Sequence, residues 1–324
     1  MIVRWGLAEV PAVLEEAGIE RPLLVTTTRW TGLALPAHEV FDGVSSHAEV
    51  RSVELAIAAA ETADGVLAVG GGSAIDTGKA VSAARDIPLV SVPTTYSGAE
   101  WTPGFGMRDE AKGVKAGGGG AHLAGIVYEV ELTLGLPPAE SGGTAMNALA
   151  HCAEALYVER RNEEADAEAL AGAPLIAEHL PAVLADGADL EARLGLLQGA
   201  VHAGAALAGA GLGLAHAMAQ ALGGRYGAPH GALNAVCLPP ALRFNADVAA
   251  EPIARFAEAI GAGDAADGAA ALARLAGFER LRDLDIPGDE LGEVAERVVE
   301  RPGARANPRR ASADEVEELL RSVF

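Results

Sequence analysis

Positive charge and cysteine are both scarce in this sequence of 324 residues. Lys and Arg number 24 against 45 Asp and Glu, which gives a formal net charge of −21. A surface this acidic repels nucleic-acid phosphates and anionic lipid, so neither is expected as a partner. An anionic cofactor or substrate would need a local positive site. The two cysteines, Cys152 and Cys237, form no CxxC pair and no disulfide framework, which indicates a reducing compartment.

Long apolar runs are also missing. No stretch reaches the ~18 clean apolar residues of a membrane span, and the N-terminus MIVRWGLAEV lacks the pattern of a signal peptide. We therefore expect a cytoplasmic protein. Half of the residues are hydrophobic, enough for a full core, and the length predicts about two domains of ~150 residues each.

The first part of the chain alternates predicted strands and helices. Buried-strand patterns occupy residues 22–28, 65–73 and 87–95, and helical patterns occupy 8–17, 48–62 and 74–85. This order predicts a parallel, Rossmann-like sheet with right-handed crossovers.

The pattern changes after Pro137-Pro138, where helices broken by Gly and Pro take over. We predict an α/β dinucleotide-binding domain at 1–137 and an all-helical catalytic or substrate domain at 138–324. Ser312 and Glu315 form a capping box that predicts a final helix over 313–323.

A glycine turn, VGGGSAID (69–76), lies between a predicted strand and helix. Its free backbone N–H groups can bind a pyrophosphate, and Lys79 would add positive charge. The turn is neither GxGxxG nor a P-loop, so a simple tight turn is the alternative, and the context favours phosphate. The next strand ends in hydroxyls, at the sheet edge where open α/β sheets bind ligands. The candidate cofactor contacts are Gly71, Gly72, Ser73, Asp76, Thr94, Thr95 and Ser97.

Three histidines form a second constellation. Asn147 and His151 are four residues apart and share a helix face, His216 and Gln220 repeat this spacing, and His230 follows in APHG. Three imidazoles can hold zinc or iron and leave a position open for substrate. Histidines on Ala-rich helices are also common as structural residues, and spacing alone leaves the two interpretations even.

Together, GGGSAIDTGKA, VPTT, the helix around His151 and AHAMAQALGGRYGAPHG resemble, in this order, the iron-containing (group III) alcohol dehydrogenase superfamily. The resemblance covers nearly the whole chain. It implies the dehydroquinate synthase-like fold, with an α/β domain and an all-α domain. In that superfamily one Asp and three His hold the metal, and the matching positions are Asn147, His151, His216 and His230. Because Asn147 replaces the carboxylate, metal affinity should fall.

Within the superfamily, MNALAHCAEALY, TTYSGAEWTP, ELTLGLP (131–137) and ANPRR (306–310) are similar to the maleylacetate reductase branch. This resemblance implies NAD(P)H-dependent reduction of maleylacetate to 3-oxoadipate without an obligatory metal. The sequence departs from the family pattern at Gln220, which stands where a histidine close to the nicotinamide is usual, and at Tyr128-Glu129-Val130.

Reduction of such a substrate generates an enolate oxygen that must be stabilised, and a carbon that must be protonated. The candidate catalytic residues are His151, His216, His230, Asn147 and Lys115. One histidine would donate the proton and the others would bind the oxyanion, with the assignment open. Lys115 or Lys112 would bind a substrate carboxylate or the nicotinamide ribose, and Lys112 is taken as a cofactor contact.

Two other functions stay open. One is a metal-dependent (Zn or Fe) alcohol or aldehyde dehydrogenase in which Asn147 coordinates through its oxygen. The other is a catalytically decayed protein that only binds a cofactor. Thr27 ends the first strand near the expected adenine ribose, and with no acid there both NAD and NADP are allowed. The expected partners are a small dicarboxylate and, by the usual preference of soluble oligomers, a second copy in a homodimer.

Overall fold

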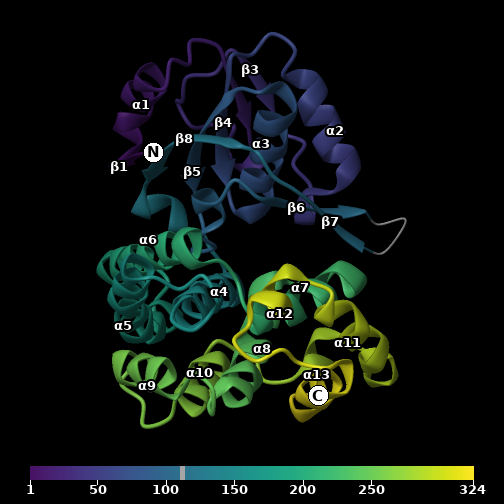
Figure 1. Ribbon diagram of the computed structural model, residues 1–324. Coiled ribbons are helices and arrows are strands. Elements are labelled where there is room, and N and C mark those ends of the chain that lie inside the picture. Colours follow the sequence, from purple (N-terminus) through teal and green to yellow (C-terminus); the bar gives the residue numbers. More distant parts are fainter. Residues whose placement is uncertain (110–113) are drawn as a thin grey trace. The chain divides into compact units, whose positions relative to one another are not determined.

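The computed structural model describes residues 1–109 and 114–324. The chain forms two compact units (Figure 1). Unit 1 comprises Met1–Thr95 and Ala99–Thr133, and unit 2 comprises Tyr96–Gly98 and Leu134–Phe324. The assignment of Tyr96–Gly98 to unit 2 had no signal in the sequence. The functional division at 137/138 stays a prediction.

Unit 1 is built on a six-stranded sheet with the order β1-β8-β5-β4-β2-β3, in which every neighbouring pair is parallel. The predicted parallel sheet is confirmed, and the strand patterns at 22–28, 65–73 and 87–95 correspond to β2, β4 and β5. The strands are β1 (Ile2–Trp5), β2 (Pro22–Val25), β3 (Glu39–Phe41), β4 (Gly65–Gly70), β5 (Pro88–Pro93) and β8 (His122–Tyr128). A separate antiparallel hairpin joins β6 (Phe105–Asp109) and β7 (Val114–Gly118).

Both faces of the sheet are covered, which explains why its central strands read as continuous apolar runs. In β4, Leu67 and Val69 pack with α1 (Val10–Glu16), whereas Val66 and Ala68 pack with α2 (Val50–Ala59) and α3 (Gly72–Arg85). A Cβ added at Gly78 would lie 2.7 Å from the Ala68 Cβ, so this glycine allows α3 to lie close to the sheet. The close packing fixes the start of α3 at the end of β4.

Unit 2 is helical, with α4 at its centre in contact with α5, α6 and α8. Where α4 crosses α8, a Cβ at Gly231 would lie 2.3 Å from the Gly143 carbonyl oxygen. Only glycine permits this approach, and it places the side chains of the two helices next to each other. The helices are α4 (Pro138–Ala155), α5 (Glu163–Ala185), α6 (Leu190–Ala210), α7 (Leu214–Tyr226), α8 (His230–Asn245), α9 (Ala250–Ala259), α10 (Ala265–Leu275), α11 (Leu291–Val299), α12 (Pro302–Ala306) and α13 (Ala313–Ser322).

The chain ends as predicted, in α13 with a capping box between Ser312 and Glu315. Its polar face is charged and its buried face is made of Val316 and Leu320. Within the described ranges, no single helix has the length and apolar composition to span a membrane. The bent pair α6 and α7, with an angle of 99° at the break, meets the length and composition test only as a pair.

Candidate active site

The glycine turn lies at the carboxyl end of β4, between the ends of β5 and β2 in the sheet. Gly70 has a φ of 147°, in the region that favours glycine, and Gly71 precedes the first residue of α3. A Cβ at Gly71 would lie 2.9 Å from the Thr95 Cγ2, so the turn needs a glycine here as well. Helix α3 has no side-chain cap. Its first N–H groups are therefore available to an anion.

Hydroxyl groups flank this turn on both sides. The Thr26 hydroxyl donates to the Val69 carbonyl at 2.8 Å, and Thr27 follows it at the end of β2. On the other side, the Thr94 amide donates to the Gly70 carbonyl at 3.0 Å. The Thr95 hydroxyl is buried and has no hydrogen-bond partner. A buried hydroxyl without a partner beside an uncapped helix start fits a polar ligand.

Lys79 does not add its positive charge to the glycine turn, as the sequence had predicted. Its ammonium is buried two turns along α3 and donates to the carbonyls of Ala99 and Gly104 at 2.7 and 2.6 Å. Asp76 pairs with it at 2.8 Å and also accepts from the Gly106 amide. The prediction that Lys79 adds its charge to a phosphate site is wrong, because the charge is bound to the loop after β5.

The structure gives contacts for only some of the other residues that were predicted to bind ligands in unit 1. Ser73 lies in the first turn of α3, and its hydroxyl accepts from the His47 amide at 3.0 Å. Lys115 pairs with Arg108 in the backbone register of the β6–β7 hairpin. Lys112 lies outside the described residues. The roles predicted for these residues stay predictions.

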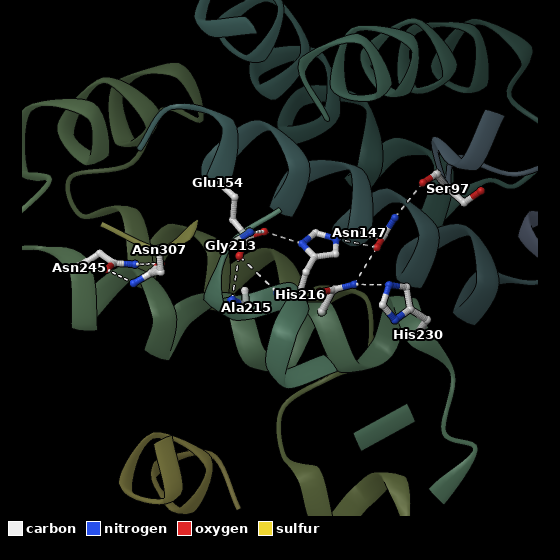
Figure 2. A network of polar contacts seen from close by, with 10 residues as sticks. Ser97, Asn147, Glu154, Gly213, Ala215, His216, His230, Asn245 and Asn307 are labelled. Carbon is white, nitrogen blue, oxygen red and sulfur yellow. Dashed lines mark hydrogen bonds and ion pairs between the residues drawn. The ribbon is translucent and has the colours of Figure 1, made fainter. Parts of the chain in front are cut away.

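In unit 2, Asn147 is the centre of a buried polar network (Figure 2). Its amide nitrogen donates to the Ser97 carbonyl at 2.9 Å, which fixes the orientation of the amide. Its oxygen accepts from the Asn234 amide at 2.7 Å and faces the Nε2 of His216 at 3.3 Å. Ser97, predicted as a cofactor contact, therefore lies against this network, and its own buried hydroxyl has no partner.

Glu154 holds the opposite side of His216. Its carboxylate accepts from the backbone amides of Gly213 and Ala215 at 2.7 Å each, and from the Nδ1 of His216 at 2.7 Å (Figure 2). Glu154 thus caps the start of α7, where a carboxylate is favoured by the helix dipole. The two backbone amides are donors, so both carboxylate oxygens act as acceptors toward the start of the helix.

Both ring nitrogens of His216 face acceptors, the Glu154 carboxylate at Nδ1 and the Asn147 oxygen at Nε2. A neutral imidazole has one N–H, whereas the imidazolium has two. The arrangement therefore suits a positively charged ring, and His216 is buried with its counter-charge at 1% and 0% side-chain exposure. Asparagine at position 147 supplies both an oxygen toward the ring and an N–H donor to the Ser97 carbonyl, whereas a carboxylate could supply only the oxygen.

His151 stacks on His216, with the ring centroids 4.6 Å apart and an 11° angle between the planes. Burial, together with the charge of His216, holds the pKa of His151 well below its ordinary value. Its Nδ1 is buried without a partner. Of the two stacked rings, His151 is therefore the one disfavoured in its charged form.

His230 begins α8 and is the most exposed of the three rings. Its Nε2 lies 3.1 Å from the Asn234 amide nitrogen, which also donates to Asn147. Because that amide nitrogen is a donor, the Nε2 of His230 accepts and the ring proton lies on Nδ1. The hydrogen bonds thus run without a break from Glu154 to His230.

The four side chains that the resemblance assigns to a metal are brought together, but as a hydrogen-bonded network. The Asn147 oxygen already accepts from Asn234, and the Nε2 of His216 is directed at the same oxygen. Within residues 1–109 and 114–324, no group of three or more His, Cys, Asp or Glu side chains is placed to hold a metal ion. A divalent cation needs a charge or a free lone pair on each of its donors. Because these donor atoms already face hydrogen-bond partners, the set as arranged does not fit such a cation.

Sequence reasoning missed Glu154 and Asn234. Each of these residues has a recognisable signal in the sequence. Glu154 is an acid in the apolar stretch that follows His151, and Asn234 lies four residues after His230, the spacing also seen for Asn147 and His151. A buried acid on an apolar helix requires a partner, and the partner is His216.

Two family models match the chain. Residues 3–124 match "Iron-containing alcohol dehydrogenase", and residues 142–324 match "Fe-containing alcohol dehydrogenase family, C-terminal". Among curated proteins, a maleylacetate reductase of Burkholderia cepacia is 37% identical over 81% of this chain and 74% of its own length. Maleylacetate reductase 2 of Cupriavidus pinatubonensis is 34% identical over 97% of this chain and 91% of its own.

Solved structures show the same similarity. The maleylacetate reductase of a Rhizobium species superimposes with a TM-score of 0.90 at 32% identity, covering 100% of this chain and 95% of that one. A protein from Ralstonia eutropha described as a putative alcohol dehydrogenase gives a TM-score of 0.92 at 33% identity, with coverage of 100% and 95%.

Proposed function

Because the chain belongs to the iron-containing alcohol dehydrogenase family, and is therefore a nicotinamide-dependent oxidoreductase, we propose that it reduces maleylacetate to 3-oxoadipate with NADH or NADPH. Maleylacetate reductases match nearly the full chain at 32–34% identity. The observation that carries the proposal is the network around Asn147, in which a buried histidine faces a carboxylate and an amide oxygen at positions to which the family resemblance assigns a metal. The reaction proposed is therefore independent of a metal.

The cofactor would be bound by the turn and the hydroxyls of unit 1. The uncapped start of α3, with Gly71 and Gly72, would receive the pyrophosphate. Thr95 supports this assignment with a buried hydroxyl that lacks a partner. When bound, the nicotinamide supplies the hydride.

The chain's own residues would then handle the charge and the proton. Hydride addition to the alkene carbon places negative charge on the ketone oxygen, which a fixed positive site stabilises. The His216 imidazolium provides this charge, and Glu154 keeps it oriented. His230 is the ring that a ligand can reach most easily, so we assign it the donation of a proton to carbon, with the proton resupplied from solvent.

We further propose a cytoplasmic homodimer that takes a small dicarboxylate. Both cysteines are buried and free, which suits a reducing compartment. The dimer rests on the general preference of soluble oligomers for twofold symmetry.

The proposed activity is measured directly by following NADH and NADPH oxidation with maleylacetate. We expect turnover that survives EDTA and is not raised by added zinc or iron, because no step needs a cation. Activity that EDTA abolishes and zinc or iron restores would instead identify the metal-dependent dehydrogenase. No turnover under any of these conditions would exclude maleylacetate as the substrate.

Replacing His230 by alanine is expected to lower kcat by about 100-fold or more, the usual contribution of a general acid. NADH affinity should be unchanged, because the proposed pyrophosphate site is the glycine turn at the start of α3. The matched control is His38→Ala, which removes an exposed histidine in unit 1. A near-normal kcat for His230→Ala, with a normal solvent isotope effect, would remove His230 from the proposed mechanism.

A further inference from the structure

Arg301 is a partly buried guanidinium with too few acceptors. It lies between α11 and α12, and its Nη1 donates to the Gln220 side-chain oxygen at 3.3 Å. Its Nε is shielded from solvent and has no acceptor. In the part of the chain that the structure describes, no carboxylate pairs with it. A partly buried charge normally has an acid or several acceptors.

The missing acid is unusual for this chain. Acids outnumber bases 45 to 24. On the neighbouring helix α7, Arg225 is bound by both Glu290 and Glu293 at 2.7 Å. Arg301 instead has Arg297 one turn before it, and burial, together with this second cation, lowers the pKa of Arg301. Arg301 therefore has a like charge nearby and, among the described residues, no carboxylate within ion-pair distance.

Gln220 connects Arg301 to the polar network. Gln220 and His216 are four residues apart on α7 and share one face of the helix. The chain just after Arg301 packs against the start of the same helix, since a Cβ at Gly303 would lie 2.5 Å from the Gly213 carbonyl oxygen. Gly213 is also the residue whose amide Glu154 accepts. Arg301 is thus held along the α7 face that carries the His216 imidazolium.

We propose that Arg301, positioned by Gln220, binds a carboxylate of the substrate. The identity of the carboxylate rests on the proposed function, and the anion site itself does not. A guanidinium offers a fork of N–H donors that suits a carboxylate, and Gln220 occupies only one of them. The substrate class that follows is an oxo acid whose carboxylate lies one helical turn from the oxyanion site.

A cofactor phosphate is the competing occupant, because it is also an anion. It is disfavoured because unit 1 has its own uncapped helix start with an unpartnered hydroxyl beside it. Arg301 belongs to unit 2, as do Gln220 and the histidines. A substrate carboxylate and a cofactor phosphate are different ligands for the same arginine. Measuring the binding of each ligand to an Arg301 variant therefore separates the two possibilities.

The test compares wild type with Arg301→Met by calorimetric titration of the NAD-loaded enzyme with adipate, a six-carbon dicarboxylate. We expect Arg301→Met to weaken adipate binding at least ~10-fold, the typical effect of losing a charge-assisted hydrogen bond. NADH affinity should be unchanged, and KM for maleylacetate should rise by a similar factor. Gln220→Met is expected to weaken adipate binding in the same direction by a smaller factor, since it leaves the cation but frees it to move.

The control is Arg305→Met, which removes an exposed arginine of α12 and should bind adipate like wild type. Wild type that fails to bind adipate, Arg301→Met that binds it normally, or a loss of NADH affinity in its place would each overturn the proposal. If Arg301→Met does not fold, Gln220→Met and Arg301→Lys decide, and normal adipate binding in both would overturn it. Arg301-dependent adipate binding without maleylacetate turnover would uphold the anion site and reject only the proposed function.

Discussion

Replacing Glu154 by glutamine is expected to lower kcat by at least ~100-fold while leaving NADH affinity unchanged. The carboxylate accepts from three backbone amides, those of Gly213, Ala215 and His216, and lies 2.7 Å from the Nδ1 of His216. Glutamine has the same shape but only one acceptor oxygen, so one side of this arrangement loses its acceptor. More importantly, the buried ring loses its counter-charge, and a neutral His216 can no longer stabilise an enolate. Loss of the acid that orients a catalytic histidine lowers kcat roughly 10⁴-fold in serine hydrolases.

Glu154 is a positioning residue, so the measurement must separate its effect on His216 from its effect on folding. Nitrogen NMR of the histidine rings should show both His216 nitrogens in hydrogen bonds in wild type and a changed Nδ1 signal in Glu154→Gln at the same pH. Glu154→Asp retains the charge and should recover part of kcat. The matched control is Glu168→Gln, because Glu168 also bonds a histidine, His202, at 2.6 Å but at 41% and 38% side-chain exposure. A folded Glu154→Gln enzyme with normal kcat would contradict the assignment.

The sheet of unit 1 could be predicted because its central strands are buried on both faces. β4 and β5 read as continuous apolar runs bounded by Gly and Pro, and the runs alternate with helical patterns. The interior strand β8, which follows the glycine run 117–120, was not predicted, and neither were the edge strands β1 and β3. They are four and three residues long and partly exposed, so neither a continuous run nor a clear alternation marks them.

The sequence could predict only those parts of the site that depend on the spacing of residues within one helix. Asn147 and His151 share a helix face, and the three histidines could be grouped from the sequence, but only the resemblance assigned all four positions to one site. Glu154 contacts His216 across 62 residues of sequence, and Arg301 contacts Gln220 across 81. Such contacts depend on helix packing, including the glycine contact between α4 and α8, which leaves no periodicity in the sequence.

Lys79 shows why a charge near a motif is a weak predictor. Its position beside the glycine turn suggested phosphate binding, yet helical geometry places its side chain on the buried side of α3. There the carbonyls of Ala99 and Gly104 satisfy it. A lysine in an acidic chain has many possible partners, and the sequence does not state which one is nearest.

Replacing Arg193 by methionine is expected to destabilise unit 2 by at least ~3 kcal/mol, estimated as about 1 kcal/mol or more for each hydrogen bond lost. Arg193 is 1% exposed, and its guanidinium donates only to neutral groups. Two of them, the Tyr96 and Ser141 hydroxyls, accept from Nη1 at 3.1 Å each. The Gly187 and Leu136 carbonyls accept from Nε and Nη2 at 2.7 and 3.3 Å. Methionine fills most of the volume but leaves these acceptors buried and unsatisfied.

For a unit of this size, that loss corresponds to a fall in Tm of roughly 6–12 °C, measured by calorimetry against the Arg310→Met control. Arg310 is exposed, so its loss should change Tm little. Arg193→Lys should fall nearly as far, since one ammonium cannot reach four acceptors set around a planar fork. The effect should reach the site, because Arg193 anchors Tyr96 and the next residue, Ser97, accepts from the Asn147 amide. Equal Tm values for Arg193→Met and wild type would mean that this buried cation contributes as much desolvation penalty as bonding.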